Sequence, residues 1–196
     1  METLGKLFGN DTKVKLIKLF IFNPEEVLDL AVIKNRVQSD LGKVRKEMIG
    51  LEKAKLVKRK HIQKRGGKKK LIAYSLNQQF QYLEQLQNFF LNSEQLQPKE
   101  IVRQLKRLGS VKLVLVAGVF IQDPESRIDL LIVGDRIRPA GLESTIRKLE
   151  SEIGKELKYA YFTTQDFKYR LSMYDKLTRD IFDYPHKLVV DKLGVL

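Results

Sequence analysis

Two apolar runs in the second half of the chain constrain its fold more than any other feature. They are VKLVLVAGVF at residues 111–120 and SRIDLLIVGD at residues 126–135, and a short polar turn separates them. Each run predicts a buried β-strand. Helical spacing over 99–109 and 138–154, with a strand pattern over 156–163, puts helices and strands in alternation. This alternation predicts a small mixed sheet covered by helices.

The end of the chain continues the same pattern. A helix is expected from Thr163 or Thr164 through residues 166–182, with Asp166 placed for a capping box. The segment HKLVV at residues 186–190 then predicts a short final strand.

Positive charge is concentrated in the first part of the chain. Residues 1–75 hold 19 Lys and Arg against 8 Asp and Glu, whereas the remainder holds 18 against 16. A net charge of +11 against +2 indicates two domains with different partners. The chain has no cysteine, and its histidines, His61 and His186, lie far apart in the sequence. We therefore expect neither a thiolate site nor a histidine metal site.

Apolar side chains at helical spacing predict two helices at the start of the basic part. The first covers residues 11–22, with Asp11 as its cap, and ends before Asn23-Pro24. The second covers residues 25–37 and is expected to turn four side chains inward: Leu28, Ala31, Val32 and Val37.

A third helix is expected to start near Ser39 or Asp40 and to run to residue 55. Spacing of three and four residues buries its apolar side chains, which are Leu41, Val44, Met48 and Leu51. The same spacing leaves three cations on the opposite, solvent-facing side: Lys43, Arg45 and Lys46.

A strongly basic hairpin follows this helix. Its strands cover residues 56–63 and 70–76, and Gly66-Gly67 supplies the turn. The second strand alternates, with three side chains expected on one face: Ile72, Tyr74 and Leu76. From Lys58 to Lys70 there are eight basic residues and no acidic one. Such a hairpin is either a solvated loop or a contact for a polyanion, and the basic helix face beside it favours nucleic acid.

The order helix–helix–helix–hairpin resembles a winged helix-turn-helix domain over about residues 10–77. In this resemblance LGKVRKEMIGLEKAKLVKRK is the recognition helix and the first strand of the wing; Ala54-Lys55 departs from the Ala-Gly pair of many relatives. The resemblance implies double-stranded DNA as the partner. By this resemblance, eight residues are expected to contact DNA: Lys43, Arg45, Lys46, Lys64, Arg65, Lys68, Lys69 and Lys70. The wing has no aromatic pair suited to stacking on unpaired bases, which favours a DNA duplex over RNA.

Residues 78–97 predict an amphipathic helix that joins residues 1–77 to residues 98–196 and ends before Pro98. Its apolar face holds Phe80, Leu83, Leu86 or Gln87, and Phe90 at helical spacing. That face must be covered. Its own domain and a second copy of the chain, in a homodimer, are the two alternatives.

The segment VLVAGVFIQDPESRIDLLIVGD resembles the core of the nucleotidyltransferase fold shared with polymerase β and the minimal nucleotidyltransferases. Active members carry Gly-Ser after the first strand, two acids one residue apart on the second strand and a further acid on a later strand. The resemblance implies that paired acids on one face of a strand hold Mg²⁺ against nucleotide phosphates.

This sequence departs from that pattern at the residues that carry the chemistry. Gly118, Ser126, Ile128 and Asp129 match, but Val119 replaces the serine after the glycine and Arg127 replaces the first acid. Lys158 and its neighbours stand where the last acid belongs, with Glu156 the nearest carboxylate. We therefore expect no catalytic residue, no metal and no cofactor, with Gly118, Arg127 and Asp129 as vestigial positions.

Two roles remain open for these vestigial positions. Asp129 is expected to form a local salt bridge or hydrogen bond, with Arg127 as one partner. The alternative is that Arg127 holds the phosphate of a nucleotide effector without a metal.

The sequence thus predicts an α+β protein: a winged helix-turn-helix at 1–77, a connecting helix at 78–97 and a nucleotidyltransferase-like domain at 98–196. The expected function is transcription regulation by DNA binding, with the second domain serving dimerisation, partner binding or effector sensing. A metal-dependent nucleotidyltransferase and an antitoxin-like interaction module are the alternatives. We see no signal peptide and no membrane span in the sequence, so a cytoplasmic location is expected.

Overall fold

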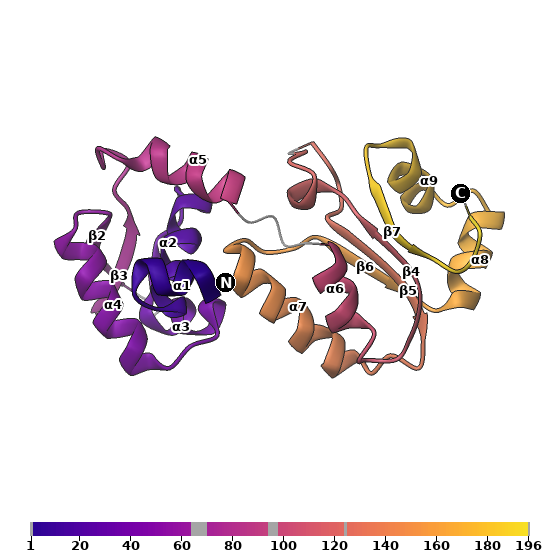
Figure 1. Ribbon diagram of the computed structural model, residues 1–196, viewed down its shortest axis with the longest axis horizontal. Helices are drawn as coiled ribbons and strands as arrows, with labels where there is room; N and C mark the ends of the chain where they lie inside the picture. Colours follow the sequence, from indigo (N-terminus) through magenta and orange to yellow (C-terminus); the bar gives the residue numbers. More distant parts are fainter. Residues whose placement is uncertain (1, 64–69, 94–97, 124, 196) are drawn as a thin grey trace. The chain divides into compact units, whose positions relative to one another are not determined.

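The computed structural model describes residues 2–63, 70–93, 98–123 and 125–195. The chain is of the α+β class and contains two small sheets (Figure 1). It divides into two compact units. The first consists of residues 1–94 with 147–155, and the second of residues 95–146 with 156–196.

The first unit packs helices against a three-stranded antiparallel sheet of order β1-β3-β2. Its elements before the short segment 147–155 are α1 (Glu2–Phe8), α2 (Asp11–Phe22), β1 (Leu28–Asp29), α3 (Leu30–Val37), α4 (Leu41–Lys53), β2 (Val57–Gln63), β3 (Lys70–Leu76) and α5 (Leu83–Ser93). Helix α2 has the bounds predicted from the sequence, residues 11–22. Its N-cap is Asn10 and not Asp11, because the Asn10 side chain accepts a hydrogen bond from the backbone N–H of Lys13 at 2.9 Å. Helix α1 was not expected from the sequence.

The predicted helix at 25–37 is shorter in the structure. Leu28 and Asp29 form β1 by pairing with Tyr74 and Ala73 of β3. The Asp29 carboxylate then caps α3, accepting from the backbone N–H groups of two residues in its first turn. Because the helix begins later than expected, its inward face also differs: Ile33 and Val37 are buried, while Ala31 and Val32 are exposed.

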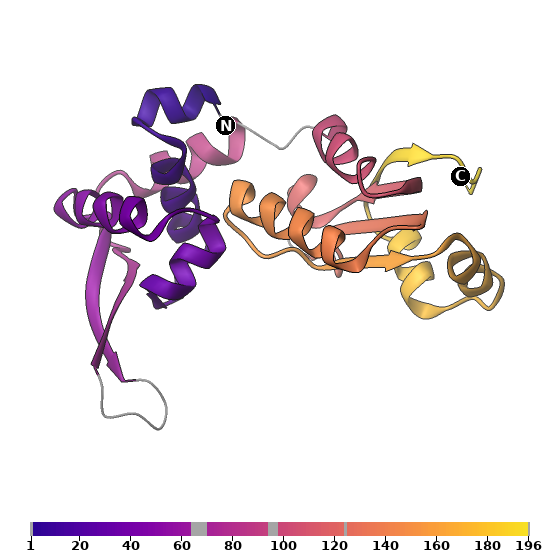
Figure 2. The same cartoon turned by 90° about the horizontal axis from the view of Figure 1, so that it is seen from below.

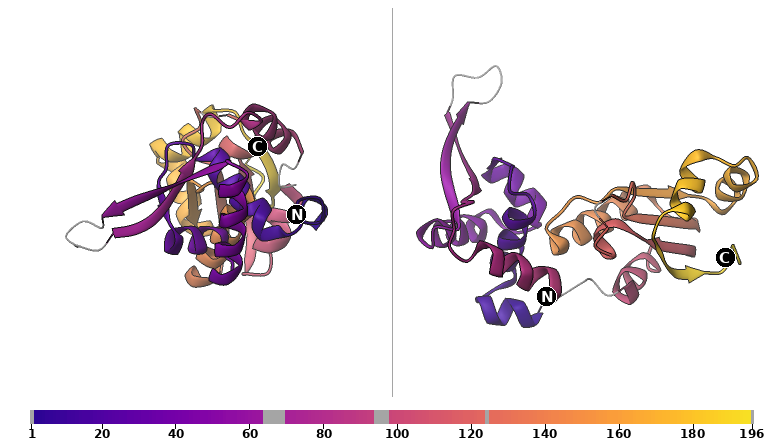
Figure 3. Two further views of the ribbon diagram at one scale, coloured as in Figure 1. Left: turned by 90° about the vertical axis from the view of Figure 1, so that its left-hand side faces the viewer. Right: turned by 90° about the horizontal axis from the view of Figure 1, so that it is seen from above.

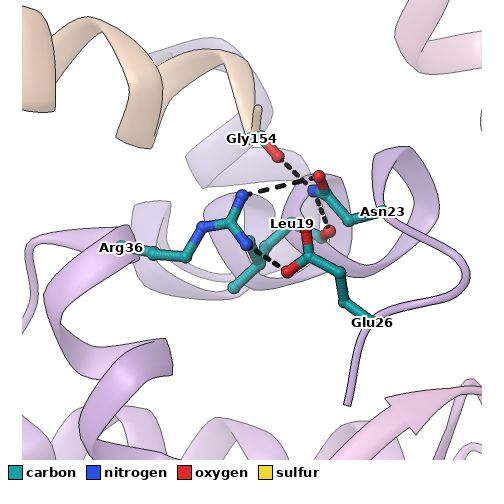
Figure 4. A network of polar contacts seen from close by, with 5 residues as sticks. All are labelled: Leu19, Asn23, Glu26, Arg36 and Gly154. Carbon is teal, nitrogen blue, oxygen red and sulfur yellow. Dashed lines mark hydrogen bonds and ion pairs between the residues drawn. The ribbon is translucent and has the colours of Figure 1, made fainter. Parts of the chain in front are cut away.

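The network in Figure 4 fixes the end of α2 against α3. Arg36 of α3 forms an ion pair with Glu26 and also donates to the side-chain oxygen of Asn23, the residue that ends α2. The amide of Asn23 donates to two backbone oxygens of the same unit, that of Leu19 at 2.6 Å and that of Gly154 at 2.7 Å. These contacts hold in place the loop that leads from α2 to β1 and α3.

Helix α4 and the hairpin follow the sequence prediction closely. Val44, Met48 and Leu51 are buried in a core that also contains Tyr74 and Leu76 of β3. Leu41, which was also expected to be buried, is only half-buried because it is the first residue of the helix. The β2 and β3 strands extend away from the helices of their unit (Figure 2; Figure 3). As expected, Ile72 lies on the same face of β3 as Tyr74 and Leu76, but it is 41% exposed, whereas those two side chains are buried.

Helix α5 is shorter than the predicted connecting helix at 78–97, and it packs on its own unit. Phe90 is buried in the core of the first unit, and Phe80, Leu83 and Leu86 are partly buried against it. The apolar face that left two alternatives open is thus covered within the chain, while Tyr82, Phe89 and Leu91 remain exposed.

The second half of the chain forms a four-stranded sheet of order β6-β5-β4-β7. Strand β4 runs antiparallel to β5 and β7, whereas β5 and β6 are parallel. The elements are α6 (Pro98–Leu105), β4 (Ser110–Val116), the short 3₁₀ helix η1 (Gly118–Phe120), β5 (Leu130–Asp135), α7 (Pro139–Ile153), β6 (Tyr159–Phe162), α8 (Thr164–Ser172), α9 (Lys176–Asp183) and β7 (Lys187–Asp191).

Several predicted elements of this half have different bounds, and three of the differences are large. The first apolar run ends as a strand at Val116, and its last residues form η1. The second run becomes a strand at Leu130, so Asp129 lies just before β5 and not on it. The long helix predicted through 166–182 is two helices, because Tyr174 adopts φ +50° and Asp175 then caps α9.

Candidate nucleic-acid interface

Helix α4 starts from a tightly constrained turn. Gln38 ends α3 in the left-handed region at φ +50°, and the Ser39 hydroxyl lies 2.8 Å from that of Thr12 on α2. The Asp40 carboxylate caps α4, accepting from the backbone N–H of Gly42 at 2.8 Å and of Lys43 at 3.3 Å. Donation from the backbone N–H groups of Lys43 and Gly42 holds the pKa of Asp40 below its usual value.

The three cations predicted on α4 are all exposed. Lys43, Arg45 and Lys46 lie on the sides of the helix that face away from buried Val44 and Met48. Within the described ranges, none of the three cationic groups forms an ion pair or a hydrogen bond. Their charges therefore remain free to meet a partner.

The sequence prediction missed the rest of this face. Ile49, Gly50 and Lys53 are also exposed on α4, and Ile49 is 48% exposed. The signal was present in the sequence: Ile49 and Lys53 follow Lys46 at intervals of three and four residues, so all three share one side of a helix. We call the exposed residues Gly42, Lys43, Arg45, Lys46, Ile49, Gly50 and Lys53 the α4 face.

The two carboxylates of α4 are paired inside the first unit. Glu47 accepts from the side-chain amide of Asn10 at 3.0 Å. Glu52 pairs with Arg59 of β2 at 2.7 Å, and this hydrogen bond raises the pKa of Arg59 above its usual value. The α4 face, which is described in full, therefore carries cations and no carboxylate.

The hairpin divides its basic side chains between two faces. Directly paired residues share a face, so Arg59, opposite Tyr74, lies on the side of the helical core, and Lys70 lies on that same side by alternation. Lys58 and Lys60 are exposed on the opposite side. Four predicted contacts lie outside the described residues: Lys64, Arg65, Lys68 and Lys69.

In the second unit, Asp129 is satisfied by backbone groups. It is 5% exposed, and its two carboxylate oxygens accept from the N–H of Val119 at 2.9 Å and of Lys158 at 2.8 Å. Its own backbone N–H donates to the carbonyl of Lys158 at 2.7 Å, and its carbonyl accepts from Ala117 at 2.9 Å. Asp129 thus joins the end of β4, η1 and the start of β6.

Gly118 is required by this arrangement. It adopts φ +50°, and a Cβ added there would lie 2.1 Å from the Oδ1 atom of Asp129. A larger residue would therefore be strained in its backbone and would also displace the carboxylate from Val119. Gly118 and Asp129 thus depend on each other: the glycine leaves the space that the Asp129 carboxylate occupies.

Arg127 does not bond to Asp129, which corrects the partner proposed from the sequence. Its guanidinium pairs with Asp180 of α9 and lies 5.9 Å from the ring centroid of Tyr184. The reason is that Asp129 is buried behind the turn, whereas the Arg127 side chain is 57% exposed. A phosphate at Arg127 would have to compete with the Asp180 carboxylate.

Among the residues that the structure describes, no group of three or more Asp, Glu or His side chains is placed to hold a metal ion. No helix in the described part of the chain is long and apolar enough to cross a bilayer. Comparison of the chain with protein-family models, curated proteins and solved structures gives no match.

Proposed function

We propose that this protein binds double-stranded DNA through its first unit and regulates transcription. The observation that carries the proposal is the α4 face, where exposed cations without protein partners lie on one helix from which both carboxylates are turned away. Exposed positive charge of this kind is matched by the phosphates of nucleic acid.

The order of elements supports the same proposal. Helix α2, strand β1, helices α3 and α4 and the β2–β3 hairpin follow one another as in a winged helix-turn-helix, with α4 in the place of the recognition helix. The short turn from Gln38 to Asp40 joins α3 to α4, as a helix-turn-helix requires.

The mechanism follows from groove geometry. Helix α4 enters the major groove, which admits a single α-helix, and Lys43, Arg45 and Lys46 meet base edges and flanking phosphates there. The tip of the hairpin contacts phosphate or the adjacent minor groove through its basic residues. Phosphate contacts fix the position of the protein and make its affinity depend on salt, whereas base contacts set the sequence preference.

For the second unit we propose a nucleotidyltransferase-like fold that has no catalytic role and serves partner binding, dimerisation or effector sensing. Two observations support the absence of a catalytic role: the Asp129 carboxylate accepts hydrogen bonds from two backbone N–H groups, and Arg127 forms an ion pair with Asp180. Nucleotide incorporation that depends on Mg²⁺ and is lost in Asp129→Asn, with the fold intact, would replace this proposal with an enzyme.

The test is selection of bound duplexes from a random DNA pool by the full chain, followed by fluorescence anisotropy on the selected duplex over a series of salt concentrations. We expect enrichment of a short motif and a logarithm of affinity that falls linearly with the logarithm of salt concentration. A single-stranded DNA and an RNA duplex of the same sequence serve as competitors, and both should bind more weakly.

The proposal fails if the selected pool stays random and affinity is the same for every polyanion of equal charge. That result would leave the basic hairpin as a solvated loop or a non-specific contact. A palindromic motif would indicate two copies on paired half-sites, and a single motif would indicate one.

A further inference from the structure

We infer that Ile49 is a specificity-determining residue that reads the C5-methyl group of a thymine on the floor of the major groove. The inference rests on the proposed DNA-binding function and names what the centre of the α4 face recognises.

The first observation is the position of Ile49 on α4. Gly42, Lys46, Ile49 and Lys53 recur every three or four residues and form one line along the helix. This line lies opposite the buried side chains Val44, Met48 and Leu51, so it is the part of α4 farthest from the core. A helix that lies in a groove turns this line toward the base edges.

The second observation is the chemistry of that line. Ile49 is the apolar side chain in it, with a cation on each side, Lys46 and Lys53, and Arg45 one turn before it. The major groove presents one apolar group, the thymine methyl, among donors and acceptors. An aliphatic side chain held among cations therefore matches a methyl group flanked by phosphates and polar base edges.

The third observation is the free space beside Ile49. A Cβ added at Gly50 would meet nothing within 4 Å, and at Gly42 it would meet only the Asp40 carboxylate, at 3.0 Å. The helix backbone is thus open at two places on its exposed side, which allows close approach to DNA.

The same geometry gives different expected DNA contacts to Lys46 than to Lys43 and Arg45. Lys43 and Arg45 lie on opposite sides of the Gly42–Lys46–Ile49–Lys53 line, so they reach toward the two walls of the groove and contact phosphates. Lys46 lies on the line itself and reaches base edges. Substituting Lys46 should therefore change the preferred sequence, whereas Lys43 and Arg45 should mainly change affinity.

The test replaces each thymine of the selected duplex by uracil, which removes the methyl group and leaves the base pairing unchanged. Loss of one buried methyl contact should weaken binding about fourfold at the recognised position. Ile49→Ala should weaken binding to the thymine duplex by a similar factor and should abolish the difference between thymine and uracil. The control is Leu7→Ala, which truncates another exposed apolar side chain on α1 and should change neither value.

The outcomes separate the two proposals. If duplexes are selected and bound through α4 but every uracil duplex binds as well as its thymine counterpart, the inference about Ile49 is overturned and DNA binding stands. If Ile49→Ala keeps the full thymine preference, another residue reads the methyl and the inference is again overturned. If no duplex is selected, the proposed function itself fails.

Discussion

The α4 face and the Gly118–Asp129 turn differ in how their charged groups are satisfied. On α4 the cations are exposed, and within the described residues Lys43, Arg45 and Lys46 form no ion pair with a carboxylate. At the turn, the one acid that matches an enzyme pattern is buried, and backbone N–H groups of Val119 and Lys158 satisfy both of its oxygens. A charged group already satisfied by its own chain stabilises the fold, whereas one left in solvent is available for a partner. By this criterion the α4 face, and not the turn, is the surface that we propose for binding.

The largest expected effect concerns Asp129. Replacing it with Ala leaves the partly buried N–H groups of Val119 and Lys158 without these acceptors and removes two hydrogen bonds to a charged group, which should lower the free energy of unfolding of the second unit by about 2–6 kcal/mol. Urea denaturation followed by circular dichroism measures the loss, and amide hydrogen exchange at β5 and β6 assigns it to this unit.

Arg127→Ala is the matched control for that experiment. It removes an exposed ion pair with Asp180 and should cost less than about 1 kcal/mol. If Asp129→Ala proved as mild as Arg127→Ala, Asp129 would not be structural, and the contrast between the two regions would be lost.

The next effect concerns the charge of the α4 face. Replacing Lys43, Arg45 and Lys46 together with Ala should weaken duplex binding about 100-fold near physiological salt, since two phosphate contacts and one base contact are lost, and the loss of the phosphate contacts should flatten the salt dependence. The control with the same change of charge replaces three exposed cations of the second unit: Lys99, Lys106 and Arg107. Anisotropy titrations measure both variants, and equal losses would reduce the binding to net charge alone.

A smaller effect is expected at Gly50, where stability and binding should change in opposite directions. Gly50→Ala adds a Cβ in open space on α4 and should raise the stability of the first unit by about 0.5–1 kcal/mol, because Ala loses less conformational entropy in a helix. The same Cβ should weaken duplex binding several-fold if DNA approaches the helix backbone closely. Increased stability with unchanged affinity would show that DNA does not approach α4 on this side.

The smallest effect is the pH dependence of the α4 cap. The folded-state pKa of Asp40 is lowered by hydrogen bonds from the backbone, so its cap stabilises the fold at pH values above the pKa of the unfolded chain, about 3.9. That stabilisation is lost as pH falls through the lower, folded-state pKa. The melting temperature of Asp40→Ala should lie below that of the wild type at neutral pH, and the gap should narrow in acid. A gap independent of pH would mean that the carboxylate charge contributes nothing to the cap.

Local periodicity was sufficient to predict the part of the molecule that we propose binds DNA. Val44, Met48 and Leu51 are buried at the positions that helical spacing predicted, so the cations between them had to be exposed. The same spacing also places Ile49 on the exposed side, although a pattern of charge alone does not single out an apolar side chain. Strands β2 and β3 were also predictable, because they are neighbours in the sequence and pair with each other.

The errors arose where partners distant in the sequence compete with local preference. Residues 28 and 29 fit a helical pattern, yet they pair with Tyr74 and Ala73 of β3, and the helix can begin only after Asp29. Phe90 likewise fitted either a dimer contact or its own core, and only the folded chain placed it in the core.

The sequence by itself determined the two-part distribution of charge, the basic face of α4 and the absence of the second acid beside Asp129. Tertiary structure decided what Asp129 does: its partners include the backbone of Lys158, 29 residues away, and no local pattern encodes which N–H group a carboxylate will meet. It also decided that Arg127 pairs with Asp180 of α9, 53 residues away. The physical reason is the range of the interactions, since periodicity is set by neighbours in the chain and the pairing of buried polar groups is set by neighbours in space.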